Sequence, residues 1–314
     1  MRGLILAAGL GERIRPLSDL RPKPALPVRG LPVIGFSLRL LARHDVRDVV
    51  INRHHLPERL SAITETARPA GTTIRWSDET SLLGTGGALR RVADFLRESD
   101  PCLLLAGDML LDADLSKLVD LHRTRGDAVT FLLKEDHRAP LFGTIGVDAD
   151  GRVRRVGRHF DLGGEVKAGI YAHATVLSAA ALASLPERDA FNHLSDWIVP
   201  RLAEGSDDVR GEVLADGECS WEPVGTLAEY LDVNLHFPAL SYVDPAALAR
   251  ETGTRCEGGV VLGAGAILGE GALLERSVVW DGERVPAGFR GRDGVFAGGR
   301  FHPCAAAVEP GDAG

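Results

Sequence analysis

Short apolar runs alternate with amphipathic segments of helical period through the first two-thirds of the chain, and this alternation restricts its fold more than any other feature. Gly3–Ala7 and Cys102–Ala106 carry no polar side chain, so both strands are expected to be buried on both faces. In Val33–His44 the apolar residues recur instead at the spacing of one helix face. Apolar strands separated by helices are typical of a parallel sheet covered on both sides. The sequence therefore predicts an α/β fold with helices on both faces of the sheet.

The other expected elements follow from the same periodicities. Strands are predicted at residues 48–52, 73–76 and 128–133, and helices at 57–68, 87–97, 115–125, 174–184, 194–205 and 227–235. The segments 144–147 and 152–156 flank a turn of sequence DADG, which is typical of an antiparallel hairpin. This hairpin is expected to extend the parallel sheet.

The C-terminal part of the chain has a different period. Aliphatic residues recur every six positions there, with glycines between them: Val261, Ile267, Leu273, Val279 and Val285. A six-residue period is typical of a parallel β-helix, in which the aliphatic side chains form a buried ladder. Chance repetition in a glycine-rich loop is the alternative. We expect a larger domain over residues 1–240, a short left-handed β-helix cap over 241–304 and a flexible tail over 305–314.

Composition excludes several classes of protein. Hydrophobic residues make up 45% of the chain and charged residues 25%, a balance typical of folded domains and not of disordered chains. No apolar run approaches the roughly 18 residues of a membrane-spanning helix, and the apolar N-terminal stretch is too short for a signal peptide. The four cysteines are scattered without a CxxC pair, which argues against a zinc site or a disulfide framework and favours a reducing cytoplasm.

The charge of the chain is unevenly distributed. The formal net charge is −8, which argues against a nucleic-acid or anionic-membrane partner. Residues 1–30 nevertheless hold six basic side chains against two acidic ones. A basic segment on an acidic protein suits a small polyanion such as a nucleotide, and a solvated basic surface is the alternative.

The segment Leu6–Pro24 (LAAGLGERIRPLSDLRPKP) carries the most specific chemistry. It follows an expected buried strand, and Gly9 and Gly11 let its backbone approach an anion closely. Arg13 and Lys23 add the positive charge that a polyphosphate needs. The chain has only four lysines among its 36 basic residues, so a lysine here indicates that a compact charge is required. The loop lacks both the G-K-[ST] of a Walker A motif and the third glycine of the dinucleotide fingerprint.

This segment resembles the N-terminal signature of the nucleoside-diphosphate-sugar pyrophosphorylases, also called sugar-1-phosphate nucleotidyltransferases. The signature reads approximately L-A-A-G-x-G-x-R-[LM]-x-P-L-T and then x-x-x-P-K-P-[LM], with Ser18 here for Thr and Ala25 for Leu. Other segments similar to family motifs are Leu83–Leu89 (LGTGGAL), Ala106–Asp108 (AGD), Ala168–Tyr171 (AGIY) and Trp221–Asn234 (WEPVGTLAEYLDVN). The resemblance covers about residues 1–237, and LGTGGAL is most similar to the form common among mannose-1-phosphate guanylyltransferases.

The resemblance implies a Rossmann-like nucleotidyltransferase sheet and a cytoplasmic, Mg²⁺-dependent enzyme that transfers a nucleotidyl group from a nucleoside triphosphate to a sugar 1-phosphate. GTP and mannose 1-phosphate are the expected substrates, and UTP or dTTP with another hexose or heptose phosphate is the alternative. The implied catalytic residues are Arg13, Lys23 and Asp108, with Asp108 as the Mg²⁺ ligand. The implied nucleotide-binding residues are Leu6, Ala8, Gly9, Gly11, Arg13, Lys23, Thr85, Gly86 and Asp108. The implied sugar-phosphate-binding residues are Gly143, Glu165 and Lys167.

Plainer structural roles are open for several of these residues. An aspartate that follows a buried strand, as Asp108 does, is also a common turn residue. Thr85 is expected to cap the helix that follows it, and Lys167 could be a solvated lysine at a strand edge. The histidines are not expected to form a site, and those at positions 54, 55 and 122 are expected to be solvated or structural.

One position departs from the family pattern. Where the motif W-x-D-[IV]-G-T has a second metal-binding aspartate, this chain has Pro223, which offers neither a side-chain ligand nor an N–H. Three explanations are open: Asp108 holds the metal with phosphates and water alone, Glu222 or Asp216 replaces the missing ligand, or the enzyme is impaired. An impaired enzyme would fit a weakly active or regulatory nucleotide-binding paralogue. The sequence does not fix the oligomeric state, and a homo-oligomer is compatible with it.

Overall fold

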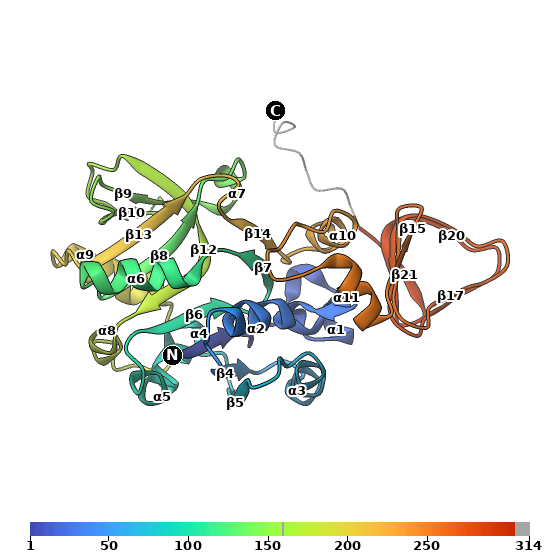
Figure 1. Cartoon of the computed structure of the whole chain (residues 1–314), viewed down its shortest axis with the longest axis horizontal. Coiled ribbons are helices and arrows are strands. Elements are labelled where there is room, and N and C mark those ends of the chain that lie inside the picture. The colour runs from blue at the N-terminus through green and yellow to red at the C-terminus, as the bar shows by residue number, and fades with distance from the viewer. Residues whose placement is uncertain (159, 305–314) are drawn as a thin grey trace.

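The computed structural model describes residues 1–158 and 160–304, and the expected tail over 305–314 lies outside them. The strands of its central sheet are β1 (Arg2–Leu6), β4 (Asp48–Arg53), β5 (Thr73–Asp78), β6 (Cys102–Ala106), β8 (Val129–Lys134), β9 (Ile145–Val147), β10 (Val153–Val156), β11 (Phe160–Asp161), β12 (Lys167–Leu177) and β13 (Val209–Leu214). Their main order is β11-β10-β9-β12-β6-β1-β4-β5, with β8 beside β12 and β13 beside β8 (Figure 1). β6, β1, β4 and β5 are parallel, whereas β12 is antiparallel to β6. The centre of the fold is therefore a mixed α/β sheet rich in parallel pairs.

Helices cover both faces of this sheet, because its central strands carry apolar side chains on both faces. The principal helices are α2 (Val33–Arg43), α3 (Pro57–Thr66), α4 (Gly84–Arg91), α5 (Ala93–Arg97), α6 (Leu115–Arg125), α8 (Ala179–Ala183), α9 (Val199–Ala203), α10 (Leu227–Leu235) and α11 (Pro245–Thr252). Ile5 packs in a core with α2, α3 and α6, whereas its neighbour Leu4 packs in a second core with α4, α5, α8 and α9. Successive side chains of a strand point to opposite faces, so β1 joins the two cores.

Several short elements complete the part of the chain that precedes the C-terminal strands. They are the strands β2 (Pro27–Val28), β3 (Leu31–Pro32), β7 (Met109–Asp112) and β14 (Ser220–Pro223), and the short helices Glu12–Ile14, α1 (Leu17–Leu20), Lys23–Ala25, α7 (Ala139–Phe142) and Leu194–Ile198. β14 pairs antiparallel with β7, which directly follows Asp108. This pairing places the motif around Pro223 next to the end of β6.

Most expected elements are confirmed, and two differ in an informative way. The hairpin is present as β9 and β10, and the helix predicted at 227–235 is α10. The prediction of a helix at 174–184 is wrong over its first four residues, where the chain is still in β12. β12 continues to Leu177 because it pairs with both β6 and β8. α8 begins only at Ala179, where the Ser178 side chain accepts a hydrogen bond from the Ala181 N–H. The helix predicted at 87–97 begins at Gly84 and is interrupted at Val92.

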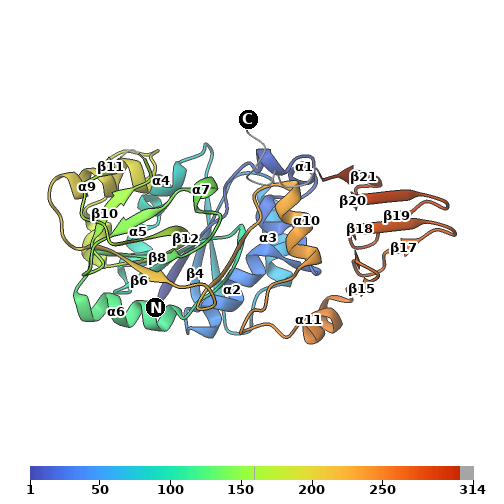
Figure 2. The ribbon, with the colours of Figure 1, turned by 90° about the horizontal axis from the view of Figure 1, so that it is seen from above.

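The C-terminal strands stack at one end of the molecule beside α10 and α11 (Figures 1 and 2). They are β15 (Arg255–Glu257), β16 (Val260–Leu262), β17 (Ile267–Leu268), β18 (Leu273–Val279), β19 (Arg284–Val285), β20 (Arg290–Ala297) and β21 (Arg300–Pro303). β16, β18 and β20 pair in parallel, with Val261 opposite Val278 and Val278 opposite Val295, a step of 17 residues. β17 and β19 pair in parallel with the same step.

The expected aliphatic ladder is only partly buried. Val261, Val279 and Val285 are buried, but Ile267 is 46% exposed and Leu273 is 54% exposed. The expectation was wrong for these two residues. Among the described strands, Ile267 lies in β17, which pairs only with β19, and Leu273 lies at the start of β18, where β20 is its strand neighbour. The buried side of the stack packs on α10. Val261 and Trp280 share a core with Tyr230 of α10 and with Ile14, which lies in the segment Leu6–Pro24, called the glycine loop below. No helix in the described ranges combines the length and apolar character needed to cross a bilayer.

Candidate functional site

The glycine loop leaves the end of β1 and is fixed by hydrogen bonds at several points. The Leu6 carbonyl accepts from the Gly107 N–H at 2.9 Å, which joins β1 to the segment after β6. Gly11 has φ +66°, and a Cβ on it would lie 3.0 Å from the Cβ of Ser18. The buried Ser18 hydroxyl donates to the Gly11 carbonyl at 2.8 Å. Glycine is therefore required at position 11, and Ser18 closes the loop onto it.

Lys23 and Asp108 meet at the carboxyl end of β6. The Lys23 Nζ donates to Asp108 Oδ2 at 2.7 Å, and the two side chains are 13% and 39% exposed. Burial alone would raise the pKa of Asp108, but the charge and hydrogen bond of Lys23 outweigh it and leave this pKa below its usual value. Ligands of open α/β sheets bind outside the carboxyl ends of the strands. Two of the three predicted catalytic residues thus form one charged, partly open pair where a ligand is expected.

Arg13 lies on the other side of the glycine loop, in the short helix Glu12–Ile14, and its side chain is exposed. Its guanidinium extends toward the turn between β14 and α10: a Cβ on Gly225 would come within 3.4 Å of Arg13 Nη2. The Gly225 N–H donates to Glu229 Oε2 at 2.7 Å. Arg13 thus lies beside the turn that follows Pro223, and its guanidinium is accessible to an anion.

The loop around Thr85 and Gly86 is held by the segment that precedes α9. The Gly86 N–H donates to the Phe191 carbonyl at 2.9 Å, and a Cβ on Gly86 would lie 2.2 Å from the Phe191 ring. The Phe191 ring therefore leaves no room for a side chain at position 86. The expectation that Thr85 caps the helix is wrong, since α4 already begins at Gly84. The Thr85 hydroxyl instead pairs with Nδ1 of His193 at 2.6 Å and accepts from the His193 N–H at 3.1 Å.

A series of buried polar side chains, which was not predicted from the sequence, links the glycine loop to the loop around Thr85. The Asn52 side-chain carbonyl accepts from the Ala7 N–H at 2.6 Å, and its amide donates to Glu79 Oε1 at 2.7 Å. Glu79 Oε2 accepts from the Leu83 N–H at 3.1 Å. Asn52 is 3% exposed and Glu79 5% exposed. A polar residue at the end of the apolar run DVVIN was the available signal for Asn52, whereas no pattern marked Glu79.

Two histidines also lie in the site, contrary to expectation. The Tyr171 ring stacks on His173 at 4.6 Å between centroids and faces His193 at 5.9 Å. Burial, with a smaller effect of His173, lowers the pKa of His193 to about 3, so its imidazole is neutral. Three other histidines match the expectation of structural roles: His54 and His55 pair with backbone carbonyls and His122 with Thr130. Single histidines in a strand or loop carry no spacing signal, so the sequence could not assign these two.

The three expected sugar-phosphate residues lie on the β9–β12 side of the sheet. Gly143 is exposed at the end of α7 with φ +74°. Glu165 pairs with Arg155 at 2.7 Å and lies over Gly146. Lys167 is exposed at the start of β12. No hydrogen bond or ion pair in the described part of the chain joins any of the three to Lys23 or Asp108, and their sugar-phosphate role stays a prediction.

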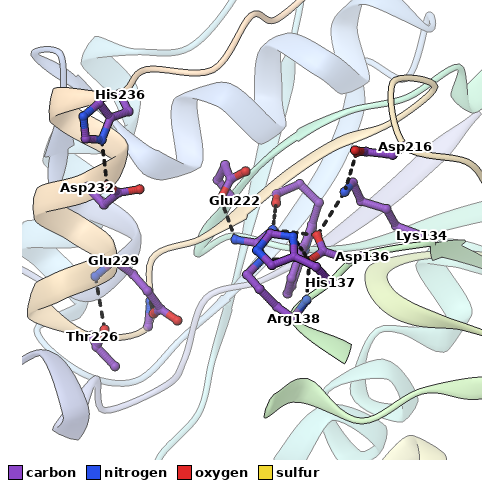
Figure 3. A network of polar contacts seen from close by, with 12 residues as sticks. Lys134, Asp136, His137, Arg138, Asp216, Glu222, Thr226, Glu229, Asp232 and His236 are labelled. Atoms are coloured by element: carbon purple, nitrogen blue, oxygen red, sulfur yellow. Dashed lines mark hydrogen bonds and ion pairs between the residues drawn. The ribbon is translucent and has the colours of Figure 1, made fainter. Parts of the chain in front are cut away.

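Pro223 stands beside Asp108, as the motif requires of the missing aspartate. It is paired with Met109, and the Val224 N–H donates to the Asp108 carbonyl at 3.0 Å. The two expected substitute ligands are engaged elsewhere (Figure 3). Glu222 accepts from Arg138 at 2.8 Å, and the 91% exposed Asp216 pairs with Lys134 at 3.3 Å.

Arg138 is the centre of this neighbouring network. It also binds the buried Asp136, whose pKa is held well below its usual range by Arg138 and Lys134 against the opposing effect of burial. Among residues 1–158 and 160–304, no group of three or more His, Cys, Asp or Glu side chains could hold a metal ion. Asp108 is the carboxylate that lies beside Lys23 at the end of β6. Such a site fits a divalent ion whose other ligands are phosphate oxygens and water, because Mg²⁺ keeps several waters and needs only one or two carboxylates.

Comparison with known proteins gives a consistent result. A model of the family described as Nucleotidyl transferase matches residues 2–239. A UTP–glucose-1-phosphate uridylyltransferase from Synechocystis sp. is 32% identical over 165 residues, 49% of this chain and 42% of that protein. A mannose-1-phosphate guanylyltransferase from Mycobacterium tuberculosis is 29% identical over 301 residues, 91% of this chain and 81% of that protein. A mannose-1-phosphate guanyltransferase from Yarrowia lipolytica is 28% identical over 271 residues, 83% of this chain and 71% of that protein.

A solved structure supports the fold independently of close sequence similarity. HddC from Yersinia pseudotuberculosis, complexed with GMP-PN, superimposes with a TM-score of 0.62 at 19% identity and covers 76% of this chain and 99% of that one. About three-quarters of this chain thus shares the fold of that solved structure.

Proposed function

The chain belongs to the nucleotidyl transferase family, and we propose that it transfers a nucleotidyl group from a nucleoside triphosphate to a sugar 1-phosphate with release of pyrophosphate. The observation that carries this proposal is the pair Lys23–Asp108, 2.7 Å apart, at the carboxyl end of β6 beside the glycine loop. A cation, a carboxylate and a glycine loop whose backbone can approach an anion are what a reaction between two phosphate-bearing substrates needs.

The proposed reaction is an in-line displacement at phosphorus. An oxygen of the sugar phosphate attacks the α-phosphorus, a new P–O bond forms, and the bond from the α-phosphorus to the bridging oxygen of pyrophosphate breaks. Negative charge accumulates on the oxygens around the α-phosphorus. Lys23 would stabilise this charge and hold the two phosphates together, and Arg13 would hold the leaving pyrophosphate. Such transfers depend on positioning and charge neutralisation and need no covalent nucleophile.

We propose Mg²⁺ as the metal, with Asp108 as its protein ligand. When bound, the metal would supply further charge neutralisation at the phosphate oxygens. Because Pro223 provides no second carboxylate, the remaining ligands would come from the triphosphate and from water. The nucleotide would then carry the metal into the site.

GTP and mannose 1-phosphate are the proposed substrates. Two relatives that align with more than four-fifths of this chain are named mannose-1-phosphate guanylyltransferase or guanyltransferase. The match to a uridylyltransferase, which spans less than half of either protein, keeps UTP with another hexose 1-phosphate as the alternative.

A matrix of substrates distinguishes these possibilities. GTP, UTP, dTTP and ATP are each incubated with several hexose and heptose 1-phosphates and Mg²⁺, and pyrophosphate release is measured. The proposal predicts the highest kcat/KM for GTP with mannose 1-phosphate. A higher value for another pair would reassign the substrates. Release from no pair would favour the weakly active or regulatory paralogue that Pro223 suggests.

We further propose that the C-terminal strands form a short left-handed β-helix that caps a catalytic domain over residues 1–240. The parallel stacking of β16, β18 and β20 supports this, because their step of 17 residues is one short of the 18 residues that three hexads would give for one turn of such a helix. All four cysteines lie in the described residues and are free thiols without a disulfide bond, which supports the expected cytoplasmic location. A homo-oligomer also stays a proposal, which the molecular mass in solution would test.

A further inference from the structure

His173 stands at an irregularity in the middle of β12. The register of β12 with β8 shifts between Tyr171, opposite Leu133, and Thr175, opposite Phe131. His173 has φ +52°, in the left-handed region that side-chain-bearing residues rarely occupy. Ala172 and Ala174 on either side are fully buried, whereas His173 is exposed. The bulge thus turns one side chain out of an otherwise buried strand.

The bulge lies beside the end of β6, where the proposed reaction centre is. On its other edge β12 pairs with β6, with Ala174 opposite Leu105. Continuing this register by one residue places His173 beside Ala106, two residues before Asp108. The charges of both Asp108 and Lys23 act on the imidazole. The Tyr171 ring, 8% exposed, stacks on the imidazole at 4.6 Å and restricts its orientation.

The backbone conformation at this position favours glycine and not histidine. Glycine adopts a positive φ without steric strain, whereas a residue with a Cβ does so at a cost in stability. Strained backbone of this kind persists where the side chain that it positions has a function. The chain uses glycine at most of its other left-handed positions, including Gly11 and Gly84 in the nucleotide loops. The imidazole is therefore the feature to be explained.

We propose that His173 is a substrate-contact residue, whose ring N–H donates a hydrogen bond to a phosphoryl oxygen that Lys23 binds beside Asp108. This inference rests on the proposed function. Phosphoryl oxygens accept hydrogen bonds only, and a neutral imidazole offers one N–H for this purpose. The oxygen belongs either to the α-phosphate of the nucleotide or to the phosphate of the sugar, since both meet at Lys23. Lys167, the other candidate for this contact, lies six residues along β12, about 20 Å away at the usual rise of a strand.

A glycine substitution separates this role from a structural one. His173→Gly removes the imidazole and relieves the backbone, so we expect an unchanged or higher melting temperature and a fall in kcat/KM of about tenfold or more. Asp45→Gly is the matched control, because Asp45 has φ +58° in an exposed turn after α2. It is expected to affect the melting temperature in the same direction and to leave kcat/KM within about twofold of wild type.

The two phosphate sources are distinguished by steady-state kinetics with GTP and mannose 1-phosphate. A selective rise in KM for the sugar phosphate assigns the contact to the acceptor, and a selective rise in KM for GTP assigns it to the nucleotide. His173→Asn tolerates the same backbone and keeps a shorter N–H donor, so it is expected to recover part of the activity lost in His173→Gly. It also serves as the second variant if the glycine variant does not fold.

The inference is overturned if wild type is active and both His173→Gly and His173→Asn retain its kcat/KM within about twofold. It is equally overturned if His173→Gly loses activity together with several degrees of melting temperature and His173→Asn restores both, because the loss would then be structural. A wild type inactive with every substrate pair would instead contradict the proposed function and remove the basis of the inference with it.

Discussion

Lys23 is the residue on which the proposed chemistry depends most. Pro22 and Pro24 flank it in a short helix, and its Nζ reaches Asp108 at 2.7 Å across 85 residues of sequence. Lysine is a compact charge with three donors, which suits simultaneous contact with the phosphates of two substrates. The pair is partly open to solvent, so its role in stability is expected to be small relative to its role in the reaction.

We therefore predict that Lys23→Ala lowers kcat by at least about 100-fold while the protein stays folded, because lost transition-state charge stabilisation is worth roughly 3 kcal/mol. Lys117→Ala, on the exposed side of α6, is the control and is expected to retain full activity. Pyrophosphate release and the circular-dichroism spectrum are measured for both variants. A folded Lys23→Ala protein with nearly wild-type release would show that Lys23 has no part in the transfer.

His193 predicts a pH dependence of stability. Burial lowers its pKa from 6.5 to about 3 in the folded state, whereas the unfolded chain has the ordinary value. Its contribution is therefore complete above about pH 6.5 and is lost as the pH falls toward 3, at about 1.4 kcal/mol per pH unit. The free energy of unfolding of wild type and His193→Asn is measured by urea unfolding between pH 4 and 7. It is expected to change less steeply with pH in the variant. Parallel profiles would contradict the buried, neutral imidazole.

At the scale of elements, the pairing of β7 with β14 places position 223 beside Asp108, where the family motif has a second aspartate and this chain has proline. β7 follows Asp108 directly, and β14 pairs with it so that Pro223 faces Met109. The expected substitute Glu222 is paired with Arg138, whose other partner is the buried Asp136. The network in Figure 3 thus engages Glu222, which directly precedes Pro223, and Asp216.

Pro223→Asp is predicted to lower the Mg²⁺ concentration needed for half-maximal rate, because it adds a carboxylate beside Asp108. Pro223→Asn adds a side chain of similar size without the charge and is expected to have a much smaller effect. The rate is measured as a function of free Mg²⁺ at saturating substrates. An identical Mg²⁺ dependence in wild type and Pro223→Asp would mean that position 223 does not reach the metal.

The elements also show how far the sequence could be interpreted. Long amphipathic helices such as α2, α6 and α10 were predictable because their period extends over three turns, and Lys23 and Asp108 were predictable from motifs at strand ends. The second half of β12 was mistaken for a helix because its alanines and leucine occur in helices as well as in strands. Its pairing with β6 and β8 makes it a strand, and this pairing is not visible in the local sequence. His173 and Glu79 could not be predicted, since their roles arise from tertiary contacts between distant segments, and Asn52 was marked only as the polar residue at the end of an apolar run.

At the scale of the whole molecule, the C-terminal strands and the glycine loop share one core. The Trp280 Nε1 donates to the Tyr230 hydroxyl at 2.9 Å, which donates to the Pro27 carbonyl at 2.6 Å. Arg21, two residues before Lys23, lies over the Trp280 ring at 4.7 Å and binds Asp281 at 2.8 Å. Contacts from the C-terminal strands thus reach the loop that carries the proposed catalytic lysine.

Trp280→Ala should lower the free energy of unfolding by roughly 3–5 kcal/mol, because it removes a buried indole from this shared core. Trp280→Phe, which keeps the apolar ring and loses the N–H, is expected to lose distinctly less. Urea unfolding monitored by circular dichroism compares the two variants with wild type. If Trp280→Ala left the stability unchanged, the C-terminal strands would not be packed on α10 as described.

The proposed transfer is tested most directly by following the phosphorus atom itself. GTP labelled at the α-phosphate is incubated with mannose 1-phosphate and Mg²⁺, and the products of wild type, Lys23→Ala and Asp108→Ala are separated by chromatography. The proposed reaction predicts that wild type moves the label into a nucleotide sugar while unlabelled pyrophosphate is released, and that both variants lose this transfer. Label that stays in GTP with wild type, or transfer that persists undiminished in Asp108→Ala, would contradict a nucleotidyl transfer at the Lys23–Asp108 pair.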